Sequence, residues 1–162
     1  MPGLLKSIND SEKISRALRL VSHSAVAASV IAAGLVALYT VGLSALYLLY
    51  AAVILLLPFL LVTLLRRLIN APRPYELIDI YPSAPKNKKG ESFPSRHTFS
   101  IFLIATLCIP WRIYVAVTLA VLGVVLAVCR VLLGYHFVRD VVAGFAVGVI
   151  SGVIGILITS FI

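Results

Sequence analysis

Residues 45–65 read ALYLLYAAVILLLPFLLVTLL, and Arg66 and Arg67 follow them directly. A helix of about 20 apolar residues, rising ~1.5 Å per residue, crosses a hydrocarbon core of ~30 Å. A second stretch of this kind covers residues 20–39, and further apolar segments cover residues 98–109, 113–129 and 138–162. The sequence therefore predicts an all-α fold, a multi-pass transmembrane helical bundle with about five spans.

The composition excludes a water-soluble domain. Of the 162 residues, 61% are hydrophobic, whereas soluble domains are closer to about half apolar. At this length we expect a single membrane-embedded domain, residues 1–162. The net charge of +8 comes from residues at the ends of apolar runs, with no basic patch interleaved with aromatic residues. The expected partners are therefore the membrane and a phosphorylated membrane lipid, with no nucleic acid.

The N-terminal stretch differs in character from the apolar runs. Residues 4–20 place apolar side chains at roughly helical spacing between basic ones. This pattern predicts an amphipathic helix at the membrane interface, covering residues 1–19. The alternative is a frayed basic tail, and the sequence leaves both open.

Polar residues collect at the ends of the predicted spans. The long polar stretch covers residues 66–97, and a second cluster covers residues 129–140. Because successive spans alternate in direction, the segments 66–74, 94–97 and 130–140 are expected at one membrane face. Ionisable side chains at such positions are costly and indicate a functional site.

The basic residues of these segments suit an anion. A phosphoryl group in transfer carries charge on its equatorial oxygens, which positive and N–H donors stabilise. Arg66, Arg73 and Arg130 supply such charge without deprotonating. Ser95 precedes an apolar segment as a helix N-cap would, so the backbone N–H groups after it would face the anion, with His97 on the first turn. Arg67 and Arg139, taken singly, are explained as residues that flank a span.

A nucleophile is predicted at His136. His136 and Asp140 are four residues apart, so on a helix they would share a face and form a hydrogen bond. A carboxylate on one ring nitrogen fixes the tautomer and leaves the other nitrogen free to attack. Gly134 is expected to permit a bend before them.

No metal or other cofactor is expected. The sequence has no carboxylate cluster suited to magnesium or zinc. Cys108 and Cys129 lie within apolar runs and form no Cys-x-x-Cys pair, so neither a disulfide framework nor a zinc site is predicted.

Three segments together resemble a known family. They are Arg66 to Pro74 with Arg73-Pro74 at its end, Pro94-Ser95-Arg96-His97, and Cys129 to Asp140. They are similar to the signatures of the type 2 phosphatidic acid phosphatase superfamily, the lipid phosphate phosphatases. Those signatures are Lys, six residues, Arg-Pro; then Pro-Ser-Gly-His; then Ser-Arg, five residues, His, three residues, Asp. Every spacing matches, but Arg66 replaces Lys, Arg96 replaces Gly and Cys129 replaces Ser.

The resemblance implies a metal-independent phosphatase acting on a lipid monoester or diphosphate. The lipids implied are phosphatidic acid, phosphatidylglycerol phosphate, undecaprenyl diphosphate and the lipid A class. His136 would form a phosphohistidine that Asp140 orients, and His97 would protonate the leaving group and then activate water. The phosphate-binding residues would be Arg66, Arg73, Ser95, Arg96 and Arg130.

Two other functions stay open on sequence alone: a small anion-binding transporter component, and a catalytically inactive relative that binds phospholipid. The expected location is the cell (cytoplasmic) membrane. All basic residues except Arg112 lie on the site's face, so the positive-inside rule places the site in the cytoplasm. The resemblance instead implies the outer face, which is where bacterial members of the family usually act. The sequence does not indicate an oligomeric state.

Overall fold

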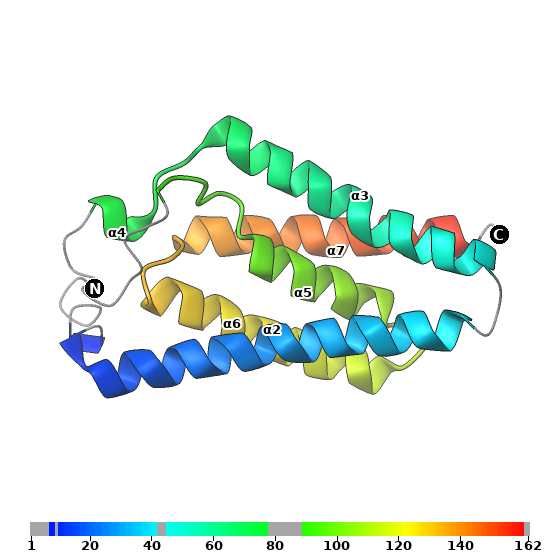
Figure 1. The fold of residues 1–162 in the computed structure, drawn as a ribbon, viewed down its shortest axis with the longest axis horizontal. Coiled ribbons are helices and arrows are strands. Elements are labelled where there is room, and N and C mark those ends of the chain that lie inside the picture. The colour runs from blue at the N-terminus through cyan, green and yellow to red at the C-terminus, as the bar shows by residue number, and fades with distance from the viewer. Residues whose placement is uncertain (1–6, 9, 42–44, 78–88, 161–162) are drawn as a thin grey trace.

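The computed structural model describes residues 7–8, 10–41, 45–77 and 89–160. These residues form helices and no strand, which confirms the predicted all-α class. The helices, labelled as in Figure 1, are α2 (Glu12–Val41), α3 (Ala45–Ile69), α4 (Pro74–Leu77), α5 (Arg96–Leu107), α6 (Ile113–Leu132) and α7 (Val138–Ser160).

The long helices lie lengthwise beside one another in an elongated bundle, with α5 in its interior (Figure 1). The end of α3, the start of α5, the end of α6 and the start of α7 gather at one end of the bundle, where α4 also lies. The three polar segments therefore share one end of the bundle, as the alternation of spans predicts.

Three of the described helical stretches are long and apolar enough to cross a membrane: Leu49–Leu77, Ile113–Leu132 and Val138–Ser160. Large apolar side chains are exposed along them, such as Leu60 on α3, Val121 on α6 and Ile150 on α7. Such surfaces suit acyl chains rather than water. The chain is thus a membrane protein. The twelve residues of α5 are too few for a full span, and most of its side chains are buried within the bundle.

The N-terminal region is organised differently from the expectation. Residues 12–19 and the first predicted span form one continuous helix, α2, so no break separates an amphipathic helix from the span at residue 20. Residues 12–33 contain neither Gly nor Pro, and a change from polar to apolar composition does not by itself end a helix. Residues 1–6 and 9 lie outside the described part, and an interfacial position for residues 1–19 stays a prediction.

The closest helix packing is between α5 and α7, the pair with the most extensive contact. A Cβ atom added at Gly144 would lie 2.5 Å from the carbonyl oxygen of Ser95, and one at Gly148 would lie 2.5 Å from that of Phe99. Backbone therefore packs on backbone. The small-xxx-small spacing of these two glycines, four residues apart, allows such a close approach.

Gly148→Ala is expected to destabilise the bundle, because the new methyl group fits only if α5 and α7 move apart. Overpacking of this kind costs about 1–3 kcal/mol. Cys108 and Cys129 are free and buried, so thermal unfolding in detergent can be followed by their reaction with a thiol-reactive fluorescent dye. Gly34→Ala is the matched control, since nothing lies within 4 Å of a Cβ atom there. An unchanged midpoint for Gly148→Ala would contradict the close packing.

Candidate active site

The segment 89–95, here called the strap, leads into α5 and is docked on the residues after α3. Asn70 ends α3 in a left-handed conformation (φ 44°), and its Oδ1 accepts a hydrogen bond from the Glu91 N–H (3.3 Å). The Ser92 N–H donates to the Ala71 carbonyl (2.9 Å). Gly90 also has a positive φ, and a Cβ atom there would lie 2.1 Å from Asn70 Oδ1. Only glycine fits at this point of the strap.

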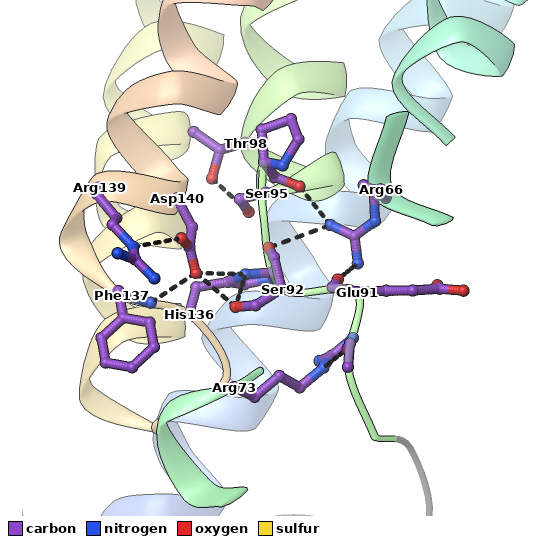
Figure 2. A network of polar contacts seen from close by, with 12 residues as sticks. Arg66, Arg73, Glu91, Ser92, Ser95, Thr98, His136, Phe137, Arg139 and Asp140 are labelled. Carbon is purple, nitrogen blue, oxygen red and sulfur yellow. Dashed lines mark hydrogen bonds and ion pairs between the residues drawn. The ribbon is translucent and has the colours of Figure 1, made fainter. Parts of the chain in front are cut away.

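Two of the predicted phosphate-binding arginines hold the strap (Figure 2). Arg66 donates from Nη1 to the carbonyls of Pro94 and Ser92 (3.4 Å to Ser92) and from Nη2 to that of Glu91. Arg73 donates from Nε to the Gly90 carbonyl (2.9 Å). A guanidinium has five N–H donors, so these bonds occupy only part of each group. Both arginines are buried.

Glu76 fixes the same corner. Its Oε1 accepts hydrogen bonds from the backbone N–H of Arg73 (3.1 Å) and of Gly90 (2.7 Å). One carboxylate oxygen thereby joins the segment after α3 to the start of the strap.

Ser95 takes the predicted N-cap position of α5, with φ −70° and ψ 110°, but its side chain makes no capping hydrogen bond. Its Oγ instead accepts a hydrogen bond from Thr98 Oγ1 (3.0 Å). The Ser95 N–H donates to the Asp140 carbonyl (2.8 Å), which ties the start of α5 to the start of α7. Because α5 begins at this end of the bundle, its first-turn N–H groups, including that of His97, point toward this end.

His136 lies in the turn between α6 and α7, and not on a helix with Asp140 as predicted. Gly134 (φ 71°) makes the turn, the Tyr135 N–H donates to the Arg130 carbonyl (3.0 Å), and α7 begins only at Val138. His136 Nδ1 and Asp140 Oδ2 are 3.7 Å apart, which is too far for a direct hydrogen bond. Asp140 Oδ2 also accepts from the Phe137 N–H (2.9 Å).

Ser92 lies between these two side chains (Figure 2). Its Oγ donates to Asp140 Oδ2 (2.5 Å) and lies 3.4 Å from His136 Nδ1. The sequence did not indicate Ser92, because a single serine in a loop is ordinarily a turn residue. Its place depends on the docking of the strap, which no local pattern reveals.

The other charged residues lie around this centre. Arg130 has its guanidinium carbon 5.3 Å from the centre of the Tyr135 ring, and its buried Nε has no hydrogen-bond partner among the described residues. Arg96 lies over the Phe59 ring of α3, 5.4 Å from its centre. Arg139, for which the sequence suggested only a flanking role, has Nε 3.6 Å from Asp140 Oδ1.

Burial and positive charge act together on the two histidines. Burial lowers the pKa of His136, the charges of Arg73 and Arg66 lower it further, and Asp140 opposes them. His97 lies outside the three spanning stretches. Burial lowers the pKa of His97 to about 3, helped by Arg130, His136, Arg96 and Arg66. Both rings are therefore neutral at pH 7, in surroundings that favour an anion.

These groups form one chemical centre. A neutral imidazole with a free nitrogen acts as a nucleophile, and a second imidazole close by transfers protons. Among the described residues, no three His, Cys, Asp or Glu side chains gather in a way that could hold a metal ion. The arrangement suits attack of a histidine on a bound anion.

Comparison with known proteins identifies relatives at the level of family and fold. The family model of the PAP2 superfamily matches residues 47–161. LpxE from Aquifex aeolicus has a similar structure, with a TM-score of 0.70 and 22% identity over 96% of this chain and 93% of that one. The transmembrane PAP2 type phosphatidylglycerolphosphate phosphatase from Bacillus subtilis has a TM-score of 0.53 and 21% identity, over 99% and 93% of the two chains. No curated protein matches the chain in sequence.

Proposed function

The chain belongs to the PAP2 superfamily, and we propose that it hydrolyses the phosphate monoester or diphosphate of a membrane lipid through a phosphohistidine at His136. The observation that carries this proposal is the buried pair of His136 and Asp140, 3% and 0% exposed, in a centre otherwise surrounded by arginines. A buried histidine near a carboxylate is poised for nucleophilic attack. The surrounding arginines favour a phosphate as the group that His136 attacks, because guanidinium groups match the geometry and charge of phosphate.

The position of the centre supports a lipid substrate. It lies where the ends of the long helices gather (Figure 1), and these helices expose large apolar side chains. A lipid in the bilayer would bring its phosphate to this depth while its acyl chains stay beside exposed side chains such as Leu60 and Leu64. A soluble phosphate ester has no such anchor.

Several donors are available to the phosphoryl oxygens. The Nε of Arg130 is buried without a partner among the described residues, and leaving a charged donor unpaired is costly. The first-turn N–H groups of α5 add the positive end of a helix dipole. Arg66 and Arg73 contribute charge and their remaining N–H groups, and Arg96 lies close enough for its charge to lower the pKa of His97.

The first step transfers the phosphoryl group to the enzyme. Nε2 of His136 forms a bond to phosphorus while the bond from phosphorus to the lipid oxygen breaks. That oxygen keeps the electron pair and takes a proton from His97. Burial and the surrounding charges lower the pKa of His97, but the negative charges of a bound phosphate raise it, so His97 gains the proton that it donates.

The second step releases phosphate. Water attacks phosphorus, His97, now neutral, takes a proton from this water, and the bond between phosphorus and Nε2 breaks. Inorganic phosphate leaves, and His136 returns to its neutral form. One imidazole thus acts as acid and then as base.

The candidate substrates are phosphatidic acid, phosphatidylglycerol phosphate, undecaprenyl diphosphate and lipid A phosphates, which would place the enzyme in the cell membrane. One structural neighbour is named for phosphatidylglycerolphosphate, so that lipid comes first in the panel. The purified protein is expected to release inorganic phosphate from at least one of the four. A transporter component or an inactive relative would release phosphate from none.

His136→Asn is expected to lower kcat by about 10⁴-fold or more, since removal of a nucleophile abolishes the covalent route. Acid-sensitive radiolabelled phosphate should be trapped on wild-type protein quenched during turnover with a labelled lipid phosphate, and not on the variant. His23→Asn is the matched control, because His23 is an exposed histidine of α2. Equal labelling of wild-type protein and His136→Asn would refute the phosphohistidine.

The pH dependence of kcat/KM follows from the pKa of His136. Attack requires the neutral ring, and the pKa of His136 is lowered from its usual 6.5. Activity is therefore retained as pH falls through 6.5 and is lost only at lower pH, once the ring is protonated. The profile is measured with one lipid phosphate whose own ionisation is determined by ³¹P NMR and corrected for. An acid limb from the enzyme with its midpoint at or above pH 6.5 would contradict this assignment.

Metal independence is also open to a direct test. We expect EDTA to leave the rate of phosphate release unchanged, because arginines and histidines supply the charge that a metal would otherwise provide. The control is a zinc-dependent phosphatase in the same detergent, which EDTA must inactivate. Loss of activity that added magnesium or zinc restores would overturn the metal-free mechanism.

A further inference from the structure

The nucleophile and its carboxylate do not touch. His136 Nδ1 and Asp140 Oδ2 are 3.7 Å apart, whereas the Ser92 hydroxyl is within 2.5 Å of the carboxylate and 3.4 Å of the ring nitrogen. Ser92 and Asp140 are 0% exposed and His136 is 3% exposed. The polar path on which each step is within hydrogen-bond distance therefore passes through a serine of the strap.

The chemistry of a hydroxyl fixes the direction of this path. A serine has one hydrogen to donate and lone pairs to accept with. Because its hydrogen is directed to Asp140 Oδ2, the oxygen faces Nδ1 with a lone pair. The complementary state of the ring carries its proton on Nδ1, which leaves the lone pair on Nε2, the nitrogen needed for attack.

Ser92 is held in place from three sides. Its N–H donates to the Ala71 carbonyl (2.9 Å), its own carbonyl accepts from Arg66 Nη1 (3.4 Å), and Arg66 also binds the carbonyls of Glu91 and Pro94. The hydroxyl is thus placed by the end of α3 and the residues after it, and not by the turn that carries His136 or by α7, which carries Asp140. Because Ser92 is already fixed, it can orient the His136 ring without losing side-chain conformational entropy of its own at each turnover.

We propose that Ser92 is a positioning residue for phosphoryl transfer, joining His136 Nδ1–H to Asp140 through its hydroxyl. This inference rests on the proposed function. As Nε2 binds phosphorus, the ring becomes positively charged and keeps its Nδ1 proton. The hydroxyl dipole, aligned by Asp140, stabilises that charge, and no proton leaves Nδ1.

The tautomer of His136 gives a test that needs neither activity nor a variant of Ser92. The protein has three histidines, so ¹⁵N-histidine labelling in detergent gives few ring signals, and His136→Asn identifies those of His136. The expected spectrum at pH 7 shows a neutral ring protonated at Nδ1. A ring protonated at Nε2 would overturn the proposal whether or not the protein is an enzyme.

Kinetics of Ser92→Ala give the second test. Loss of a hydrogen bond to a charged group is expected to lower kcat about 10- to 100-fold, with KM nearly unchanged because Ser92 does not touch the phosphate. The His136 signals should shift from one tautomer to a mixture. Ser92→Thr keeps the hydroxyl and should recover a large part of kcat.

Ser29→Ala is the matched control. Ser29 is also buried, but its hydroxyl donates only to the Val26 carbonyl of its own helix (2.7 Å), so its kcat should equal that of wild type. Wild-type kcat and an unchanged tautomer in Ser92→Ala would overturn the role of Ser92 and leave the phosphatase proposal intact. Absence of phosphate release from wild-type protein would instead reject the phosphatase, while the tautomer would still be measured.

Discussion

The close approach of α5 and α7 is the constraint on which the centre depends. Because Gly144 and Gly148 have no Cβ atom, α7 lies directly on the backbone of α5. The Ser95 N–H is then close enough to donate a hydrogen bond to the Asp140 carbonyl. That single bond joins the residue before α5 to the first turn of α7. His97 on one helix and Asp140 on the other are thereby fixed relative to each other. A larger residue at either glycine would push α5 and α7 apart, and would so separate His97 from Asp140 before it disturbed any charged side chain.

Besides α5 and α7, α3 also contributes to the centre, through Arg66. The contacts of Arg66 explain why an arginine suits this position. Lysine carries a compact ammonium, whereas the planar guanidinium presents donors in a fork. Arg66 uses that fork to bind three carbonyls of the strap at once. The residue expected to bind phosphate thus also shapes the segment that delivers Ser92. In the proposed mechanism, substrate binding and orientation of His136 would be linked through the same guanidinium, so the first polar segment would influence the chemistry at His97 and His136.

The all-helical class, the three long apolar helical stretches and the shared end of the bundle were predictable, because each follows from the order and length of the apolar segments; of the about five predicted spans, three are long and apolar enough among the described residues. The errors have a different origin. A spacing of four between His136 and Asp140 fits a helix, but it also fits the turn that Gly134 makes, and only packing decides between them. Ser92 was missed because its position results from Asn70, Glu76 and Arg66, which are 16 to 26 residues away in sequence. The boundary at residue 20 was expected from a change in composition, although nothing in residues 12–33 ends a helix.

The centre has more positive than negative side chains, which suits it to bind an anion. Arg66, Arg73, Arg96 and Arg130 surround two histidines, and Asp140, shared with Arg139 and Ser92, is the fully buried carboxylate among the described residues. These cations repel one another and any further positive charge, and together with burial, which is the larger cause, they lower the pKa of His97 to about 3. In the proposed mechanism, the negative charge of a bound phosphate offsets the repulsion between the arginines and raises the pKa of His97. In this mechanism, the acid needed to expel the lipid oxygen would therefore be formed by substrate binding itself, so the ring of His97 would be charged only when there is a leaving group to protonate.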